Sequence, residues 1–416
     1  MITGKENLIC GLLGKTLRHS LSPAIHSLLC DYSYSLFEIE ENGLKEFLWG
    51  DFDGINVTIP YKKEVMKHLD FISPEAEAIG AVNTVKKKDG KLYGYNTDIY
   101  GFEKTLERAK ISLEGKKVLI LGTGGAAQTV LYAAKKQSAN AIFVSRSGEV
   151  NYTNVLSLHA DADIIVNTTP VGMFPDNLSS PISLDGFDKL SSVIDLVYNP
   201  LKTAILLDAE ARGIKAVSCI DMLFYQALRA CEIFTDTTKD KADCEALLSR
   251  FVADKTNIVL VGMPGSGKST VGEIIAKTLS REFIDCDAEI EKKHGMSCAE
   301  IIEKHGEAKF RELESEVIRK VGALTGAIIS TGGGAVTVNA NKNALRQNAR
   351  VYFLNRDINE LPTDNRPLSQ KCGVTELYKA RLPMYLDFAD CTVSVTDAES
   401  TAKAVIKEHY NENTCN

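Results

Sequence analysis

The strongest constraint on this chain is the segment GMPGSGKST at Gly262–Thr270, which directly follows the apolar run NIVLV and directly precedes the helix-like VGEIIAKTL. A strand, a glycine-rich loop and a helix in this order cradle phosphate, because the glycines let backbone N–H groups turn toward phosphate oxygens at the helix N-terminus. The spacing GxxxxGK[ST] adds a lysine charge near the transferred phosphoryl group and a hydroxyl that can bind Mg²⁺. The residues expected to hold the nucleotide are Gly262, Gly265, Ser266, Gly267, Lys268, Ser269 and Thr270.

Short apolar runs alternate with longer amphipathic stretches along the whole chain, which favours layered α/β folds. The 416 residues exceed one ordinary core, so two or three folding units are expected. The pattern starts at the amino terminus, restarts at the run VLIL before a second glycine-rich loop, and restarts again at NIVLV. The main boundary is predicted near residues 253–256.

The composition excludes several classes of protein. The formal net charge of −7, with no cluster of lysine and arginine beside aromatic residues, argues against a nucleic-acid binder. No apolar stretch approaches the ~18 residues that a membrane span needs. The ten cysteines are scattered without a CxxC pair, and the histidines show no metal-binding spacing. Reduced thiols in the cytosol are therefore expected.

The second glycine-rich loop, GTGGAA, follows an apolar run and opens a helix, as a dinucleotide pyrophosphate site requires. An NAD site normally carries an acid at the end of the next strand, whereas this strand ends in Ser145-Arg146-Ser147. An arginine with flanking hydroxyls suits a 2′-phosphate, so NADP(H) is predicted. Glu149 follows closely, so the strictness of NADP over NAD stays open. The expected cofactor residues are Gly122, Gly124, Gly125, Ala126, Ser145 and Arg146.

Four features downstream of the phosphate-binding loop resemble the shikimate kinase family. They are Asp285-Cys286-Asp287, Gly306-Glu307 with Phe310-Arg311 and Glu314, the triplet Gly332–Gly334, and Arg381 with Tyr385. The resemblance implies that Asp287 accepts the proton of the attacking hydroxyl, with Lys268 at the transferred phosphoryl group. It also implies Mg²⁺ at Ser269 and Asp285. The residues implied to bind shikimate are Arg311, Gly333, Gly334 and Arg381, and Arg366 would cover the phosphates of ATP.

The amino-terminal part resembles the shikimate dehydrogenase family over nearly its full length. The resemblance is carried by Ser20-Leu21-Ser22-Pro23, Asn56–Lys62, Gly80–Thr84, Gly94–Asp98, Asn167–Pro170 and Tyr225-Gln226. It implies NADPH-dependent reduction of 3-dehydroshikimate, with Lys62 and Asp98 flanking the reacting carbonyl. The residues implied to bind the substrate are Ser20, Ser22, Thr58, Asn83 and Gln226.

Two intervals and one residue depart from these families. Only 16 residues, 147–162, join two strands predicted to be parallel, so the crossover helix is expected to be short or missing. Asp221 stands where the dehydrogenase family usually has glycine. The interval from Leu354 to Arg366 is shorter than the usual kinase lid.

Three domains are therefore expected. Residues 1–100 with 221–254 would bind the dehydrogenase substrate, residues 101–220 would form a Rossmann NADP domain, and residues 255–416 would form a P-loop kinase with a parallel sheet covered on both faces. Each half supports the other, since the product of the first reaction is the substrate of the second. The alternatives are a quinate/shikimate dehydrogenase fused to a different small-polyol kinase, and a catalytically inactive metabolite sensor. A monomer or a homodimer is expected.

Overall fold

The computed structural model describes residues 8–17, 20–361 and 373–411. It divides into two compact units, one of Met1–Tyr198 with Ile205–Leu248 and the other of Asn199–Ala204 with Ser249–Asn416. The division falls inside the helix α9 (Lys241–Lys255). None of the described helices is long and apolar enough to cross a membrane.

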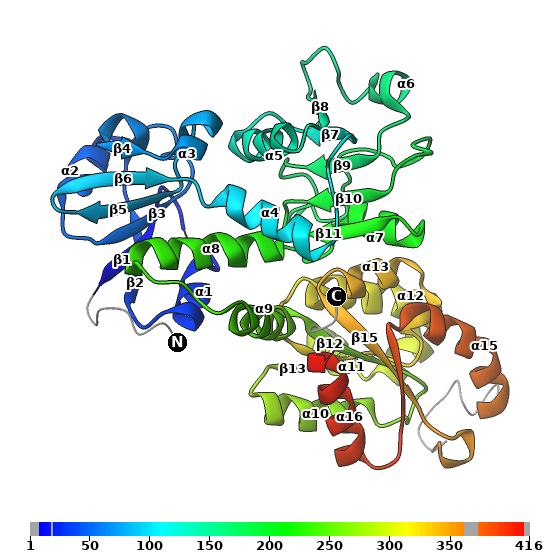
Figure 1. Ribbon diagram of the computed structural model, residues 1–416. Helices are drawn as coiled ribbons and strands as arrows, with labels where there is room; N and C mark the ends of the chain where they lie inside the picture. The colour runs from blue at the N-terminus through cyan, green and yellow to red at the C-terminus, as the bar shows by residue number, and fades with distance from the viewer. Residues whose placement is uncertain (1–7, 18–19, 362–372, 412–416) are drawn as a thin grey trace. The chain divides into compact units, whose positions relative to one another are not determined.

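The first unit begins with a six-stranded mixed sheet of strand order β2-β1-β3-β5-β6-β4 (Figure 1). Strands β1, β2 and β3 are parallel, and the hairpin β5–β6 is antiparallel. The hairpin turns at Asp89-Gly90, where both residues have positive φ, the conformation that favours a tight turn between twisted strands. The elements are β1 (Ile9–Gly14), α1 (Ser22–Leu29), β2 (Ser33–Glu38), η1 (Glu41–Gly43), α2 (Leu44–Trp49), β3 (Gly54–Val57), η2 (Val65–His68), β4 (Phe71–Ile72), α3 (Pro74–Ile79), β5 (Thr84–Lys88) and β6 (Lys91–Tyr95).

The second sheet of this unit has five parallel strands in the order β11-β10-β9-β7-β8, which confirms the predicted Rossmann-like arrangement. The crossover helix between β8 and β9 has only five residues, so the expectation of a short helix is also confirmed. The elements are β7 (Lys117–Leu121), α5 (Gly125–Lys136), β8 (Asn140–Val144), α6 (Val155–His159), β9 (Ile164–Asn167), β10 (Ser192–Asp195), α7 (Ala204–Ala211) and β11 (Lys215–Ser218).

Two helices, α4 (Asp98–Arg108) and α8 (Ile220–Thr235), pack closely side by side in the first unit (Figure 1). Gly101 makes the close approach possible, since a Cβ at this position would lie 2.5 Å from the carbonyl oxygen of Met222. This contact holds Asp98, at the start of α4, near the face of α8 that carries Met222 and Gln226.

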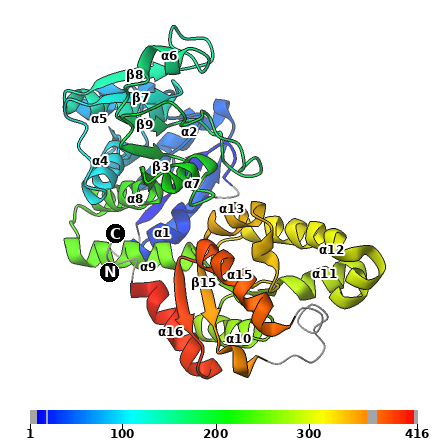
Figure 2. The same ribbon diagram turned by 90° about the vertical axis from the view of Figure 1, so that its right-hand side faces the viewer.

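The second unit has a five-stranded parallel sheet of order β13-β14-β12-β15-β16. Figure 2 shows strand β15 of this sheet among the helices of the unit. Apolar clusters cover both faces, one with side chains from α11, α12, α13 and α15 and the other with side chains from α10 and α16, which confirms the predicted architecture. The strands are β12 (Asn257–Val261), β13 (Phe283–Asp285), β14 (Ile328–Ser330), β15 (Ala349–Asn355) and β16 (Cys391–Ser394). The helices are α10 (Lys268–Leu279), α11 (Cys286–His294), α12 (Cys298–Gly322), η3 (Ala335–Thr337), α13 (Ala340–Arg346), η4 (Ile358–Glu360), α15 (Val374–Phe388) and α16 (Ala398–Asn411).

Helix α12 is kinked, because Gly306 has a φ of 84° inside it. Only glycine adopts this backbone conformation without strain, so Gly306 is required for two helical segments to meet at an angle. The second segment carries Arg311 and Glu314 toward the carboxyl ends of the strands.

Candidate active sites

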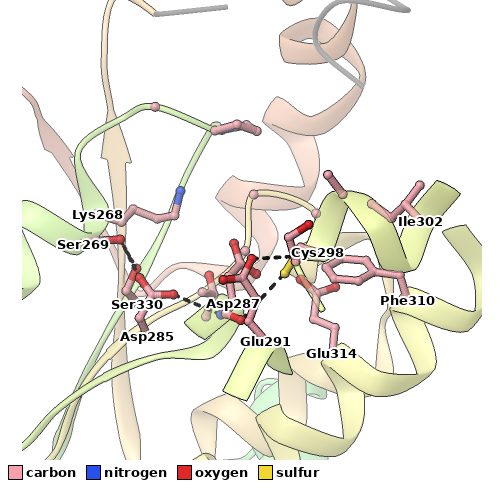
Figure 3. A pocket seen from close by; sticks show the side chains of 18 of the residues that line it. Lys268, Ser269, Asp285, Asp287, Glu291, Cys298, Ile302, Phe310, Glu314 and Ser330 are labelled. Carbon is pink, nitrogen blue, oxygen red and sulfur yellow. Dashed lines mark hydrogen bonds between the residues drawn. The ribbon is translucent and has the colours of Figure 1, made fainter. Parts of the chain in front are cut away.

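The second unit contains a cavity of about 720 Å³ bordered by the phosphate-binding loop (Figure 3). Side chains reach it from the carboxyl ends of the parallel strands, the edge where ligands bind in sheets of this kind. The cavity brings together nearly all the residues predicted for the kinase half. Its lining includes Gly265, Gly267, Lys268, Ser269, Thr270, Asp285, Asp287, Arg311, Gly333, Gly334 and Arg381.

The phosphate-binding loop is closed by Lys268, the first residue of α10. Its Nζ donates to the carbonyl oxygens of Gly262 at 2.9 Å and Met263 at 3.0 Å. Gly267 has a φ of 91°, which a side chain would strain, so this turn depends on glycine. The ammonium group of Lys268 thus lies against the backbone of the loop, where it can reach a phosphate group that the loop binds.

Ser269 and Asp285 supply oxygen atoms of the kind that Mg²⁺ prefers. The Oγ of Ser269 donates to Oδ2 of Asp285 at 2.6 Å, while Oδ1 of Asp285 accepts from the backbone N–H of Asp287 at 3.0 Å. Asp285 is thus the N-cap of α11 and also faces the loop. One hydroxyl and one carboxylate next to a phosphate-binding loop fit a Mg²⁺ ion that keeps most of its water ligands.

Asp287 is a candidate general base. Burial in this cavity, reinforced by repulsion from Glu314 and then Asp285, raises its pKa to about 6. Its Oδ1 is buried, and a Cβ on Gly332 would lie 2.7 Å from that oxygen. The adjacent Cys286 points into the apolar core instead. A carboxylate with a pKa near neutrality is suited to accept a proton from a hydroxyl group.

Two guanidinium groups converge on the glycine triplet. Arg311 donates to Glu314 at 2.7 Å and to Glu307 at 3.0 Å. Arg381 donates to the carbonyl oxygen of Gly333 at 3.1 Å. A Cβ on Gly334 would lie 2.1 Å from Nη2 of Arg311, so the absence of a side chain lets the guanidinium group lie against the backbone. Paired guanidinium groups beside a bare backbone surface can bind a small carboxylate.

The first unit contains a second cavity, of about 490 Å³, which brings together the catalytic and substrate-binding residues predicted for the dehydrogenase half, with Ala126 as the one predicted cofactor residue in its lining. Its lining comes from β1 and β3 of the first sheet, from the segments that follow β10 and β11, and from the helices α1, α4, α5 and α8. The predicted residues among its walls are Ser20, Ser22, Thr58, Lys62, Asn83, Asp98, Ala126 and Gln226.

The centre of this cavity is an ion pair between Lys62 and Asp98. Nζ of Lys62 donates to Oδ2 of Asp98 at 2.6 Å, and the side chains are 28% and 17% exposed. Nδ2 of Asn83 donates to Oδ1 of the same carboxylate at 2.8 Å. Asp98 does not cap α4, because the N-cap residue is Thr97 and Oδ1 of Asn96 accepts from the N–H groups of Asp98 at 3.1 Å and Ile99 at 3.4 Å. The carboxylate is thus oriented toward the ammonium group and the cavity.

The side chain of Asn83 is oriented by the backbone of the motif Gly94–Asp98. Its Oδ1 accepts from the N–H of Thr97 at 2.7 Å, which leaves Nδ2 pointing at Asp98. On another wall, Oδ1 of Asn56 accepts from the hydroxyl of Tyr34 at 2.8 Å. The polar groups around the ion pair are therefore held by hydrogen bonds before any ligand binds.

The second glycine-rich loop leads into α5, whose first residue is Gly125. Gly122 has a φ of 103°, and Gly124 is the N-cap. The residues from Thr123 to Ala126 are exposed, so the N-terminus of α5 is accessible to a pyrophosphate. Ser145 and the exposed Arg146 directly follow β8, which pairs with β7, the strand that precedes the loop.

Comparison with known proteins identifies both halves. The model of the shikimate dehydrogenase substrate-binding domain matches residues 12–85, and the shikimate kinase model matches residues 264–412. The NADP⁺ shikimate dehydrogenase of Clostridium perfringens strain SM101 is 42% identical over 255 residues, which cover 56% of this chain and 94% of that protein. This chain belongs to the shikimate dehydrogenase family. Together, the matches make it a fusion of a shikimate dehydrogenase with a shikimate kinase.

Solved structures of the dehydrogenase family agree with this assignment. A chorismate mutase/shikimate 5-dehydrogenase fusion from Clostridium acetobutylicum is 36% identical with a TM-score of 0.57, and covers 59% of this chain and 97% of that one. The shikimate 5-dehydrogenase of Thermus thermophilus, solved in complex with NADP(H) and shikimate, is 33% identical with a TM-score of 0.53. That match covers 58% of this chain and 99% of that one.

Asp221, which the sequence singled out as a departure from the dehydrogenase family, does not line the cavity. Its carboxylate accepts from Nη1 of Arg108 at 2.8 Å, and Arg108 also contacts Glu245 at 2.7 Å. The side chain of Asp221 is thus directed toward α4 and α9 rather than toward the ion pair of Lys62 and Asp98.

Several cavity residues received no role from the sequence. Asn56, Glu314 and Tyr385 stood inside quoted motifs, but only packing shows that they face the sites or their walls. Tyr198 in the dehydrogenase cavity and Arg356 in the kinase cavity lay in no motif at all. Their position along the chain could have identified them, because both residues closely follow the carboxyl end of a parallel strand, where ligands bind. The predicted phosphate contact Arg366 lies outside the described residues.

Proposed function

We propose that the first unit reduces 3-dehydroshikimate to shikimate with NADPH and that the second unit phosphorylates shikimate with ATP to shikimate 3-phosphate. The observation that carries the proposal is the ion pair of Lys62 and Asp98 in a cavity next to a dinucleotide loop. Asp287, facing a phosphate-binding loop in the same chain, supports the second reaction.

In the first reaction, NADPH supplies the hydride when bound. The ammonium group of Lys62 donates a hydrogen bond to the carbonyl oxygen of the substrate and stabilises the negative charge that grows there. Asp98 holds the ammonium group at 2.6 Å and takes part in moving the proton to the new hydroxyl group. Ser20 and Ser22 bind the carboxylate, and Thr58, Asn83 and Gln226 bind the ring hydroxyls.

In the second reaction, Asp287 accepts the proton of the attacking hydroxyl group while Lys268 stabilises the charge on the transferred phosphoryl group. Arg311 and Arg381 orient the acceptor by its carboxylate, with the ring against the backbone of Gly333 and Gly334. Ser269 and Asp285 would hold Mg²⁺, which neutralises charge on the phosphates.

The chain is proposed to act in the cytosol as a monomer or a homodimer. The cysteines within the described residues are free thiols, which fits a reducing compartment.

A coupled assay with 3-dehydroshikimate, NADPH, ATP and Mg²⁺ tests the proposal, with shikimate 3-phosphate as the expected product. Lys62→Ala should abolish the oxidation of NADPH and spare phosphorylation of added shikimate. Lys268→Ala should do the reverse. Loss of both activities in either variant with the fold intact would contradict the assignment of two separate sites. Faster turnover of quinate than of shikimate would favour the quinate alternative, and no turnover of any substrate would favour the inactive sensor.

A further inference from the structure

The kinase cavity has a fourth cationic side chain that no motif explains. Among the described residues that line the cavity, the cations are Lys268, Arg311, Arg356 and Arg381. Arg311 and Arg381 lie against the glycine triplet on the acceptor side, and Lys268 closes the phosphate-binding loop. For Arg356, the group of the substrate or nucleotide that it would bind has not yet been named.

Arg356 lies beside the phosphate-binding loop because of the strand order. It is the first residue after β15, and β15 pairs directly with β12, which leads into the loop. Nη1 of Arg356 donates to the carbonyl oxygen of Gly265, in the loop itself, at 3.4 Å. The guanidinium group thus lies beside the phosphate-binding loop.

The protein contacts of Arg356 are long. Besides the 3.4 Å contact to Gly265, Nε lies 3.4 Å from Oε2 of Glu360, and the two side chains are 30% and 58% exposed. Charge-assisted hydrogen bonds that stabilise a structure are usually about 2.7–2.9 Å long. An exposed i,i+4 ion pair contributes little to folding, so structural support alone does not account for an arginine at this position.

The charges that line the cavity indicate which ligand Arg356 can bind. The described carboxylates in the lining are Asp285, Asp287, Glu291 and Glu314, equal in number to the four cations. A triphosphate brings several further negative charges, and a guanidinium group can donate two parallel hydrogen bonds to phosphate oxygens. We propose that Arg356 binds the phosphate chain of the nucleoside triphosphate held by the loop. The proposal rests on the kinase activity proposed above.

The test compares Arg356→Ala and Arg356→Lys with two controls in the intact chain. Arg319→Ala removes an exposed arginine of α12 that does not line the cavity. Glu360→Gln removes the ion-pair partner of Arg356 and leaves the guanidinium group in place. We expect Arg356→Ala to raise the KM for ATP about tenfold, equivalent to about 1.4 kcal/mol, with the KM for shikimate unchanged. Arg356→Lys should recover part of the loss, and neither control should raise the KM for ATP.

Two binding measurements complete the test. Calorimetric titration with ADP needs no turnover, and Arg356→Ala should weaken ADP binding about tenfold. Inorganic tripolyphosphate should inhibit this variant correspondingly less well, while inhibition by adenosine should not change. Unchanged affinity for ADP, or an equal loss for adenosine, would overturn the proposal. So would a Glu360→Gln variant that behaves like Arg356→Ala, since the ion pair would then be the cause. Absence of phosphorylation by the wild-type chain would instead contradict the proposed function, while ADP binding would still decide the role of Arg356.

Discussion

Replacing Asp287 by asparagine should inactivate the kinase and at the same time stabilise its unit. The pKa of Asp287 is raised from 3.8 to about 6, chiefly by burial and then by repulsion from Glu314 and Asp285. The ionised carboxyl group therefore opposes folding at neutral pH. One pKa unit corresponds to 1.36 kcal/mol, so removing the charge should stabilise the folded unit by at most about 3 kcal/mol at pH 7.5.

The pH dependence of this gain has a defined sign. Because the folded-state pKa lies above the unfolded one, the stabilising contribution of the protonated group is fully present below pH 3.8 and is lost as the pH rises through 6. Asparagine is neutral at every pH. The difference between Asp287→Asn and wild type should therefore fall to about 1.5 kcal/mol at pH 5 and about 0.5 kcal/mol at pH 4, and approach zero near pH 3.

Urea denaturation of the full chain at pH 7.5 and pH 5 measures this difference. The transition that belongs to the kinase unit is the one that ADP shifts, since a ligand stabilises the unit that binds it. The matched control is Asp387→Asn, which removes a carboxylate that is 61% exposed and paired with Lys342. It should change stability by less than about 1 kcal/mol at both pH values. A gain for Asp287→Asn that is absent at pH 7.5, or equal at both pH values, would refute the reasoning.

Three further predictions concern activity. The kcat/KM of the kinase should fall about tenfold per pH unit below about pH 6, where Asp287 takes up a proton, and a profile flat to pH 5 would contradict its role as base. Gly334→Ala should raise the KM for shikimate at least tenfold, because its Cβ would lie 2.1 Å from Nη2 of Arg311, whereas the KM for ATP should change little in the same initial-rate assay. Arg146→Ala should raise the KM for NADPH about tenfold and leave the KM for NADH unchanged; equal changes for the two cofactors would show that Arg146 does not contact the 2′-phosphate.

Much of the architecture could be predicted from the sequence. The apolar runs before both glycine-rich loops are the strands β7 and β12, and the 16-residue interval after β8 leaves room only for the short helix α6. These features are encoded in continuous segments, where spacing and residue type fix the local backbone. The family matches confirm the dehydrogenase and kinase assignments that the motifs suggested.

The sequence alone determined which segments can bind a phosphate, because the N–H groups that bind it come from consecutive residues of one loop. Only the tertiary structure decided how distant side chains act on one another. Lys62 contacts Asp98, which lies 36 residues away in the sequence, and Arg356 contacts Gly265, which lies 91 residues away. The raised pKa of Asp287 likewise depends on burial beside Glu314. Electrostatic interactions depend on distance in space and on exposure to water, and neither quantity can be read from separation along the chain.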